Sequence, residues 1–203
     1  MRYHTRATLE IEKLKWDSFI PEKADKLIIG TFPTVKHRRS FEFFYPNKNN
    51  PFWKILSKIS DIPLVSADRE GAISNRKRIL ENLNLGITDM GYKILRRGNS
   101  SSDQSIFPIV YMDILKIIDK NPLINKLILT SSSGKNSVEG WLRSYFKSND
   151  VDFLKLKGCN PKRGFIHHNQ KEIEIVVVHS TSKAAGRKLS ELISMYRKEI
   201  MNI

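Results

Sequence analysis

Three short runs of consecutive apolar residues, at 27–29, 127–129 and 175–178, limit the folds open to this chain more than any other feature. Runs without polar alternation are typical of strands that are covered on both faces, as in a parallel sheet. A fourth candidate strand covers 85–89 and would place Asp89 at the same sheet edge as the other strand ends. Helical patterns lie between these runs, at 52–59, 72–83, 108–118, 137–146 and 184–200. This alternation predicts an α/β fold, a three-layer α/β/α sandwich with a central, mainly parallel four-stranded sheet and a site at the carboxyl ends of its strands.

The length of 203 residues predicts one domain that spans 1–203. Lys and Arg outnumber Asp and Glu by 35 to 21, which gives a net charge of +14. Such a charge favours polyanionic partners, nucleic acid first and an acidic membrane surface second. No apolar run approaches the roughly 20 residues needed to cross a bilayer. We therefore expect a cytoplasmic protein, with a monomer as the default.

The single cysteine, Cys159, excludes an internal disulfide and a four-thiolate metal site. A buried or inert thiol is the expected state of Cys159, and a catalytic thiol is the alternative. The five histidines fall at no recognised metal-binding spacing, so we expect no metal site.

The first candidate site comes at the end of the strand-like run 26–30 and consists of Gly30-Thr31-Phe32-Pro33-Thr34. Glycine permits close backbone approach and proline stiffens the loop, which leaves main-chain groups available to a flat ligand. An ordinary strand-to-loop turn is the alternative.

An aromatic segment, Phe43-Phe44-Tyr45, follows that loop and could stack on a nucleobase. We assign stacking to Phe44 alone, because most of these rings are expected in the core. Asn50 precedes Pro51, and its amide could read a base edge or position a water. A helix N-cap is the alternative for Asn50, and local physics favours it.

The second candidate site is His179-Ser180-Thr181-Ser182, which follows the β-branched last strand and precedes a basic helix. Hydroxyl groups before a helix, with Arg187 one turn later, form a potential phosphate site, and simple helix capping is the alternative. No Gly-x-Ser-x-Gly motif is present, so a Ser-His hydrolase based on His179 is disfavoured. The segment 156–169 is expected to form a loop or an edge hairpin, with Lys162 and Arg163 in reach of phosphate.

Taken in order, LIIGTFPT, FFYPNKNNPFW, GITDMGYKILRRGNSSSD and VVVHSTSKAAG resemble the sequence blocks of the uracil-DNA glycosylase superfamily, and the hypoxanthine-DNA glycosylase group most closely. The resemblance spans about 26–197. It implies a monofunctional glycosylase that flips a deaminated base, uracil or hypoxanthine, out of DNA and hydrolyses its bond to the sugar. Neither a metal nor an organic cofactor is implied.

The resemblance also implies roles for the residues above. The base-binding pocket would consist of Gly30, Thr31, Phe32, Pro33, Phe44 and Asp89. Asn50 would orient water or stabilise the leaving base, and His179 is a second possible catalytic residue. DNA would be contacted by Ser180, Thr181, Ser182, Lys183 and Arg187.

Three residues depart from the group pattern: Thr31 replaces a serine, and His179 and Lys183 each replace a proline. The preferred base therefore stays open. A noncatalytic nucleic-acid-binding protein with the same fold is the alternative, and Asn50 distinguishes the two, because an amide turned away from the pocket would remove the best candidate for excision. A nucleotide-binding α/β enzyme is a weaker third reading, since no Gly-x-Gly-x-x-Gly or P-loop motif is present.

Overall fold

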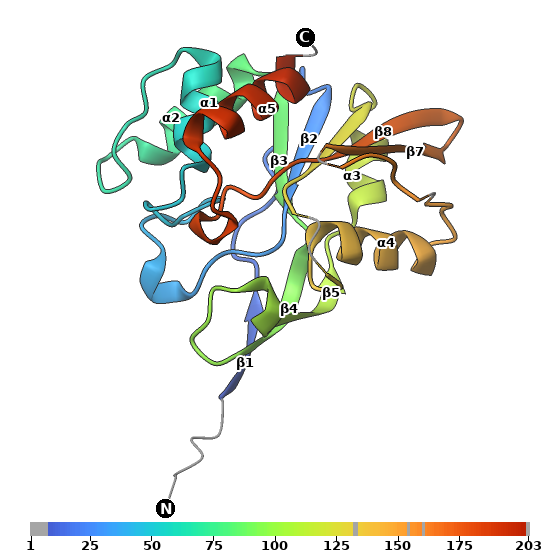
Figure 1. Ribbon diagram of the computed structural model, residues 1–203, viewed down its shortest axis with the longest axis horizontal. Helices are drawn as coiled ribbons and strands as arrows, with labels where there is room; N and C mark the ends of the chain where they lie inside the picture. Colours follow the sequence, from blue (N-terminus) through green and yellow to red (C-terminus); the bar gives the residue numbers. More distant parts are fainter. Residues whose placement is uncertain (1–7, 132–133, 154, 160, 202–203) are drawn as a thin grey trace, which may run out of the picture.

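A five-stranded sheet forms the middle layer of the protein in the computed structural model, which describes residues 8–131, 134–153, 155–159 and 161–201, the side chain of Lys183 excepted (Figure 1). The strand order is β3-β2-β6-β8-β7. The strands are β2 (Lys26–Gly30), β3 (Leu85–Asp89), β6 (Lys126–Leu129), β7 (Lys162–His168) and β8 (Lys171–Val177). Neighbours among the first four strands in this order pair in parallel, and β7 pairs antiparallel with β8 at the edge.

Helices cover both faces of this sheet (Figure 1). One face packs against α1 (Phe52–Ser60), α2 (Ala72–Asn82) and α5 (Leu189–Met201). The other packs against α3 (Ile114–Lys120) and α4 (Val138–Ser148). Each central strand sends alternate side chains into two cores, as Ile28 and Leu27 do from β2. Burial on both faces explains the continuous apolar runs, and the predicted α/β/α sandwich is confirmed.

The sheet has five strands and not the predicted four, because the segment expected as a loop or edge hairpin supplies β7. The β7–β8 register runs from the pair Lys162↔Val177 to the pair His168↔Lys171. Asn169 and Gln170 form the two-residue connection, with φ angles of 49° and 63°. Two left-handed residues in a row match the right-handed twist of the paired strands, so this hairpin is tight.

A second, smaller sheet lies beside the first and has the order β1-β4-β5 (Figure 1). Its antiparallel strands are β1 (Leu9–Lys13), β4 (Gly91–Arg97) and β5 (Ile106–Tyr111). The helix predicted at 108–118 is therefore wrong in its first part. Residues 106–111 are mostly β-branched or aromatic and pair with β4, and α3 begins only after Asp113, whose carboxylate accepts a hydrogen bond from the Lys116 N–H at 3.1 Å.

Short 3-10 helices, η1 (Lys36–Arg38), η2 (Asp103–Ser105) and η3 (Lys183–Ala185), lie in the loops of the fold. The helix predicted at 184–200 thus divides into η3 and the later α5. None of the helices in the described ranges is long and apolar enough to span a membrane.

Candidate active site

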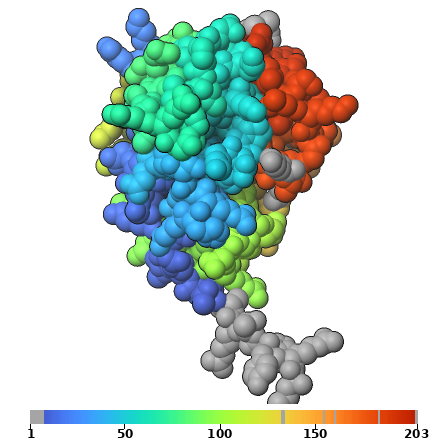
Figure 2. Space-filling model, turned by 90° about the vertical axis from the view of Figure 1, so that its left-hand side faces the viewer, coloured from blue at the N-terminus to red at the C-terminus, as the bar shows by residue number. Residues whose placement is uncertain are grey.

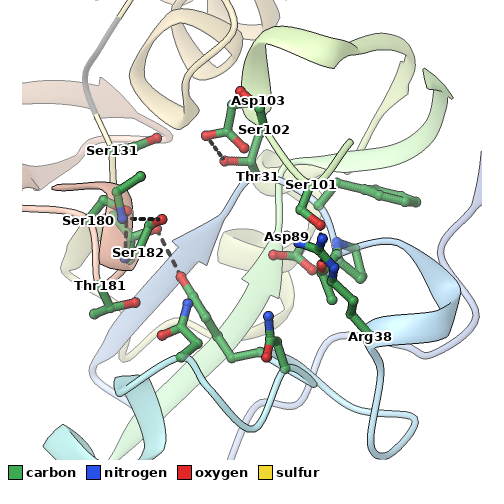
Figure 3. Close-up of a pocket in the computed structure, with 18 of the residues that line it drawn as sticks. Thr31, Arg38, Asp89, Ser101, Ser102, Asp103, Ser131, Ser180, Thr181 and Ser182 are labelled. Carbon is green, nitrogen blue, oxygen red and sulfur yellow. Dashed lines mark hydrogen bonds between the residues drawn. The ribbon is translucent and has the colours of Figure 1, made fainter. Parts of the chain in front are cut away.

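A cavity of about 610 Å³ opens where β2, β3, β6 and β8 end. Loops at 31–34, 45–50, 100–104 and 180–182 contribute most of its lining. In Figure 3 the 180–182 loop lies on one side of the cavity, and Asp89, Ser101 and Arg38 lie on the other. The loops come from four distant parts of the sequence, so the fold itself assembles the site at the predicted sheet edge.

Two carboxyl groups line the cavity, Asp89 at the end of β3 and Asp103 at the start of η2. Asp103 accepts a hydrogen bond from the Thr31 hydroxyl at 3.0 Å (Figure 3). Asp89 is only 4% exposed, and no hydrogen bond to its carboxyl group is made by the described residues. A Cβ at Gly30 would lie 2.2 Å from Asp89 Oδ1. Glycine is therefore required at position 30 for the carboxyl group to occupy this place.

Burial and, to a smaller extent, the nearby Asp103 raise the pKa of Asp89 from 3.8 to about 7, against the opposing charge of Arg39. Burial likewise raises the pKa of Asp103 to about 6, against the Thr31 hydrogen bond and the charge of Arg96. Both carboxyl groups thus titrate near neutral pH. Groups with such shifted pKa values in a cavity are typical of ligand-binding and catalytic sites.

Tyr45 forms part of the wall with a left-handed backbone, at φ 48°, which is uncommon for a residue other than glycine. Its ring stacks on Phe52 with centroids 3.7 Å apart, and its hydroxyl donates to Thr130 Oγ1 at 2.9 Å. Burial raises the pKa of Tyr45 well above its ordinary value of 10.0, so the hydroxyl stays protonated as a donor.

Phe44 does not line the cavity, so its predicted stacking on a base is wrong. Its side chain is fully buried at 0% exposure, and its ring packs edge-on against Phe43 and Trp16. The Phe44 carbonyl accepts a hydrogen bond from Trp53 Nε1 at 2.9 Å, which fixes this turn inside the core. The aromatic residues Phe32 and Tyr45 line the cavity instead.

Asn50 lies just before α1, whose N-cap residue is Pro51 and not Asn50. Its Oδ1 accepts a hydrogen bond from the Phe52 N–H at 3.0 Å, which satisfies the first N–H group of the helix. Asn50 also lines the cavity, and no described residue bonds to its Nδ2. The amide therefore keeps its donor group available to a ligand while its oxygen stabilises the helix.

His179 lies outside the set of residues that line the cavity. Its N–H contacts Met195 Sδ at 3.4 Å, and its carbonyl accepts from the Tyr196 hydroxyl at 2.9 Å, which ties it to α5. Burial lowers its pKa, as does Arg187, while Glu191 opposes the shift. The structure does not bring His179 to the other candidate residues, so we assign it no catalytic role.

Ser180, Thr181 and Ser182 do line the cavity, as predicted for this loop. Ser180 Oγ accepts from the Ser182 N–H at 3.1 Å, and Ser182 Oγ accepts from the Ala184 N–H at 3.3 Å. Their hydroxyls therefore hold a tight turn before η3. Arg187 is exposed and does not line the cavity, and the Lys183 side chain lies outside the described part of the structure.

A buried ion network of Glu12, Arg39 and Arg96 holds two of the cavity loops. Arg96 Nε donates to Glu12 Oε1, and Arg39 Nη2 donates to Glu12 Oε2 at 2.7 Å. Arg96 also donates to the carbonyls of Pro33 and Ser100, at 2.8 and 2.9 Å. The network thus joins the 31–34 loop to the 100–104 loop through β1 and β4.

Sequence reasoning missed this network, because Glu12 and Arg96 are 84 residues apart along the chain. The alternation of Leu9-Glu10-Ile11-Glu12-Lys13 is typical of a strand with one buried face and would turn Leu9 and Ile11 inward, whereas the structure exposes them and buries Glu12. A buried strand position occupied by glutamate requires a cationic partner.

Comparisons with known proteins bear on the fold. No protein-family model matches the chain, and no curated protein matches its sequence. A solution structure from Methanosarcina acetivorans described as a "putative Uracil DNA glycosylase" superposes with a TM-score of 0.61, covering 95% of this chain and 99% of that one. The chain has a uracil-DNA glycosylase fold. The sequence identity between the two is 18%, so the likeness concerns the fold alone.

Within this uracil-DNA glycosylase fold, two other predicted residues are not available for phosphate. Lys162 pairs with Glu139 at 2.9 Å, and Arg163 pairs with Glu174 and Glu199 at 2.6 and 2.5 Å. Cys159 is exposed and not buried as expected. No group of three or more His, Cys, Asp or Glu side chains among the described residues could hold a metal ion.

Proposed function

We propose that the protein is a DNA glycosylase that flips a deaminated base, hypoxanthine or uracil, into the cavity and hydrolyses its bond to the sugar. The proposal rests on two groups that line one cavity at the sheet edge and have no hydrogen-bond partner among the described residues. These groups are the buried carboxyl of Asp89 and the Nδ2 of Asn50. A cavity of about 610 Å³ is within the about 300–1000 Å³ typical of small-molecule sites.

The chemistry of deamination suits these two groups. Deamination turns a ring nitrogen of cytosine or adenine from a hydrogen-bond acceptor into an N–H donor, and turns the amino group beside it into a carbonyl. Above its pKa of about 7, Asp89 is ionised and accepts from an N–H donor, whereas two acceptors would face each other if the parent base entered. The Asn50 amide donates to the new carbonyl. An unpaired buried carboxylate is costly, so the parent base is rejected.

Hydrolysis follows from the same arrangement. As the bond between base and sugar breaks, its electron pair moves to the base, and the sugar becomes positively charged. Water adds to the sugar carbon that the base leaves, and a proton from this water neutralises the departing base. Donors such as Asn50 Nδ2 stabilise the anion as it forms, and a single donor of this kind contributes a factor of about 10² to 10³ in rate. The backbone of Thr31 and Phe32 borders the same space and would hold the plane of the base.

DNA contacts would come from the rim of the cavity. Arg38 is exposed and lines the cavity opposite the 180–182 loop (Figure 3). Ser180, Thr181 and Ser182 would press against the minor groove, with Arg187 and Lys183 near the flanking phosphates. The net charge of +14 supplies a nonspecific, salt-dependent attraction.

The test is excision from labelled duplexes that contain one uracil or one deoxyinosine, with alkali cleavage of the abasic product. Asn50→Asp keeps an oxygen for the Phe52 N–H and replaces the donor, so we expect excision to fall by about 10² or more. The control is Asn49→Asp, since Asn49 is exposed and does not line the cavity, and its activity should match the wild type.

The second candidate function is a noncatalytic nucleic-acid-binding protein. Two observations favour it, namely that Asn50 Oδ1 is engaged by the Phe52 N–H and that His179 lies outside the cavity. Salt-sensitive DNA binding without excision of either lesion by the wild type would select this candidate and reject the glycosylase.

A further inference from the structure

The small sheet exposes an apolar face that its position in the fold does not explain. Ile11 pairs with Leu95 and Leu95 with Phe107, so the three side chains form one row across β1, β4 and β5. Ten large hydrophobic side chains are exposed among the described residues. Six of these ten belong to this sheet: Leu9, Ile11, Tyr92, Phe107, Ile109 and Val110. Hydrophobic residues exposed singly are normal, but a contiguous group of them marks an interaction site.

We call this surface the outer face and define it by Leu9, Ile11, Leu95, Phe107 and Ile109. On the opposite side of the same strands Ile94 and Ile106 are buried, as are the network residues Glu12 and Arg96, whereas Glu10 is exposed. An antiparallel sheet with one solvated face normally alternates apolar and polar residues. Here both faces of the sheet carry apolar residues, so the outer face is built for contact with something other than water.

The charges on the outer face all have one sign. Lys13, Lys93 and Arg97 share it by register, since each is an even number of positions from an outer-face residue on its own strand. The carboxylates of these strands lie on the other side, where Glu10 pairs with Lys36 and Glu12 pairs with Arg96. The outer face therefore carries both apolar and cationic side chains. The carboxylates of β1 lie on the opposite side of the sheet.

The sheet also has two edges, because β1 and β5 each pair only with β4 among the described residues. Pro108 in β5 has no backbone N–H group, so the edge of β5 is less able to pair with a further strand. The edge of β1 contains no proline, and Figure 2 shows the N-terminal blue part of the chain at the molecular surface. An extended segment can add to such an edge through main-chain hydrogen bonds, with alternate side chains directed onto the sheet face.

We infer that the outer face and the β1 edge form a docking site for an acidic, amphipathic, extended segment of a partner protein. Apolar side chains of that segment would cover the row Ile11, Leu95 and Phe107, and its carboxylates would meet Lys13, Lys93 and Arg97. A second copy of this chain is a poor occupant, because cationic faces on a molecule of net charge +14 repel each other. DNA offers phosphates but no extended main chain that pairs with a strand edge, and a bilayer does not satisfy such an edge either.

The test uses the full chain and two fluorescent ten-residue peptides, one alternating valine with glutamate and one alternating valine with lysine. We expect fluorescence anisotropy to show binding of the glutamate peptide and none of the lysine peptide. The double variant Ile11→Ser with Phe107→Ser should weaken binding at least about tenfold, a change of about 1.4 kcal/mol. The control is Leu123→Ser with Phe165→Ser, which removes side chains of similar exposure, 55% and 45%, from outside the small sheet and should bind as the wild type does.

The same proteins are titrated with a single-stranded oligonucleotide and with phosphatidylglycerol vesicles, and their oligomeric state is measured by sedimentation. The inference is overturned if the two peptides bind equally or if neither binds. It is also overturned if the double variant keeps peptide binding and instead loses DNA binding, vesicle binding or self-association. Excision by the double variant should remain unchanged, since neither residue lines the cavity, so this result is independent of the glycosylase proposal.

Discussion

Asp89→Asn should make the protein more stable at alkaline pH while it replaces the acceptor-only carboxylate of the proposed base recognition by an amide that can also donate. The folded protein holds the Asp89 proton up to a pKa of about 7, whereas the ordinary value is 3.8. The folded state therefore binds more protons than the unfolded state between these values, and its stability falls as pH rises through that window. At 1.36 kcal/mol for each pH unit, the ionised carboxyl costs about 4 kcal/mol above pH 7.

An amide has nearly the shape of the protonated carboxyl but does not ionise. We therefore expect the free energy of unfolding of Asp89→Asn to exceed that of the wild type by up to about 4 kcal/mol at pH 8, and the gain to vanish near pH 4. Urea denaturation followed by circular dichroism across this range measures the difference. The exposed Asp152→Asn is the control and should follow the wild type.

A flat difference across pH, or an Asp89→Asn protein that is less stable at pH 8, would refute the reasoning, because it would mean that Asp89 is ionised at no cost in the folded state. Excision by the same variant gives a second readout. The stabilised protein should lose selectivity for deaminated over parent bases, as expected where a binding group is kept at the expense of stability.

Three further predictions concern the groups around the cavity. Arg96→Met leaves the Glu12 charge buried without its main partner, so the free energy of unfolding should fall by about 3–5 kcal/mol in urea denaturation, and a fall below 1 kcal/mol would contradict the network's role. Gly30→Ala places a Cβ 2.2 Å from Asp89 Oδ1, so excision should be lost in the gel assay, and a wild-type rate would show that the carboxyl group is not needed there. Arg38→Ala should reduce the slope of log binding constant against log salt by about 1 if this side chain neutralises one phosphate, and an unchanged slope would place it off the DNA.

The central sheet could be predicted from the sequence because its strands are buried on both faces. Leu27, Ile128 and Val176 lie in continuous apolar runs, which are typical of strands buried on both faces. The pattern alone therefore predicts that these segments are strands. The small sheet could not be predicted in the same way. Residues 106–111 lack the polar alternation of a half-exposed strand, because their outward side chains are also apolar, and the pattern was therefore interpreted as a helix.

The candidate site shows the same division. Gly30, Asp89 and Asn50 follow or precede regular elements at the sheet edge, so their positions along the chain predicted their meeting in space. Phe44 was misassigned because neighbouring aromatic residues in one turn face opposite directions, and sequence does not say which ring is turned inward. Arg96 was missed because its buried partner Glu12 lies 84 residues away, beyond any local pattern.

The Glu12–Arg96 contact also sets an order on events during synthesis. β1 leaves the ribosome first, but β4, its only strand partner among the described residues, follows about 80 residues later. At about 5–20 residues per second, β1 waits roughly 4–16 seconds as an unpaired strand with exposed apolar residues. During that interval the 31–34 loop lacks the arginine that anchors Pro33. Completion of the cavity is therefore delayed until the chain has been made past β4, and the nascent protein has a period in which an early strand is open to wrong pairing.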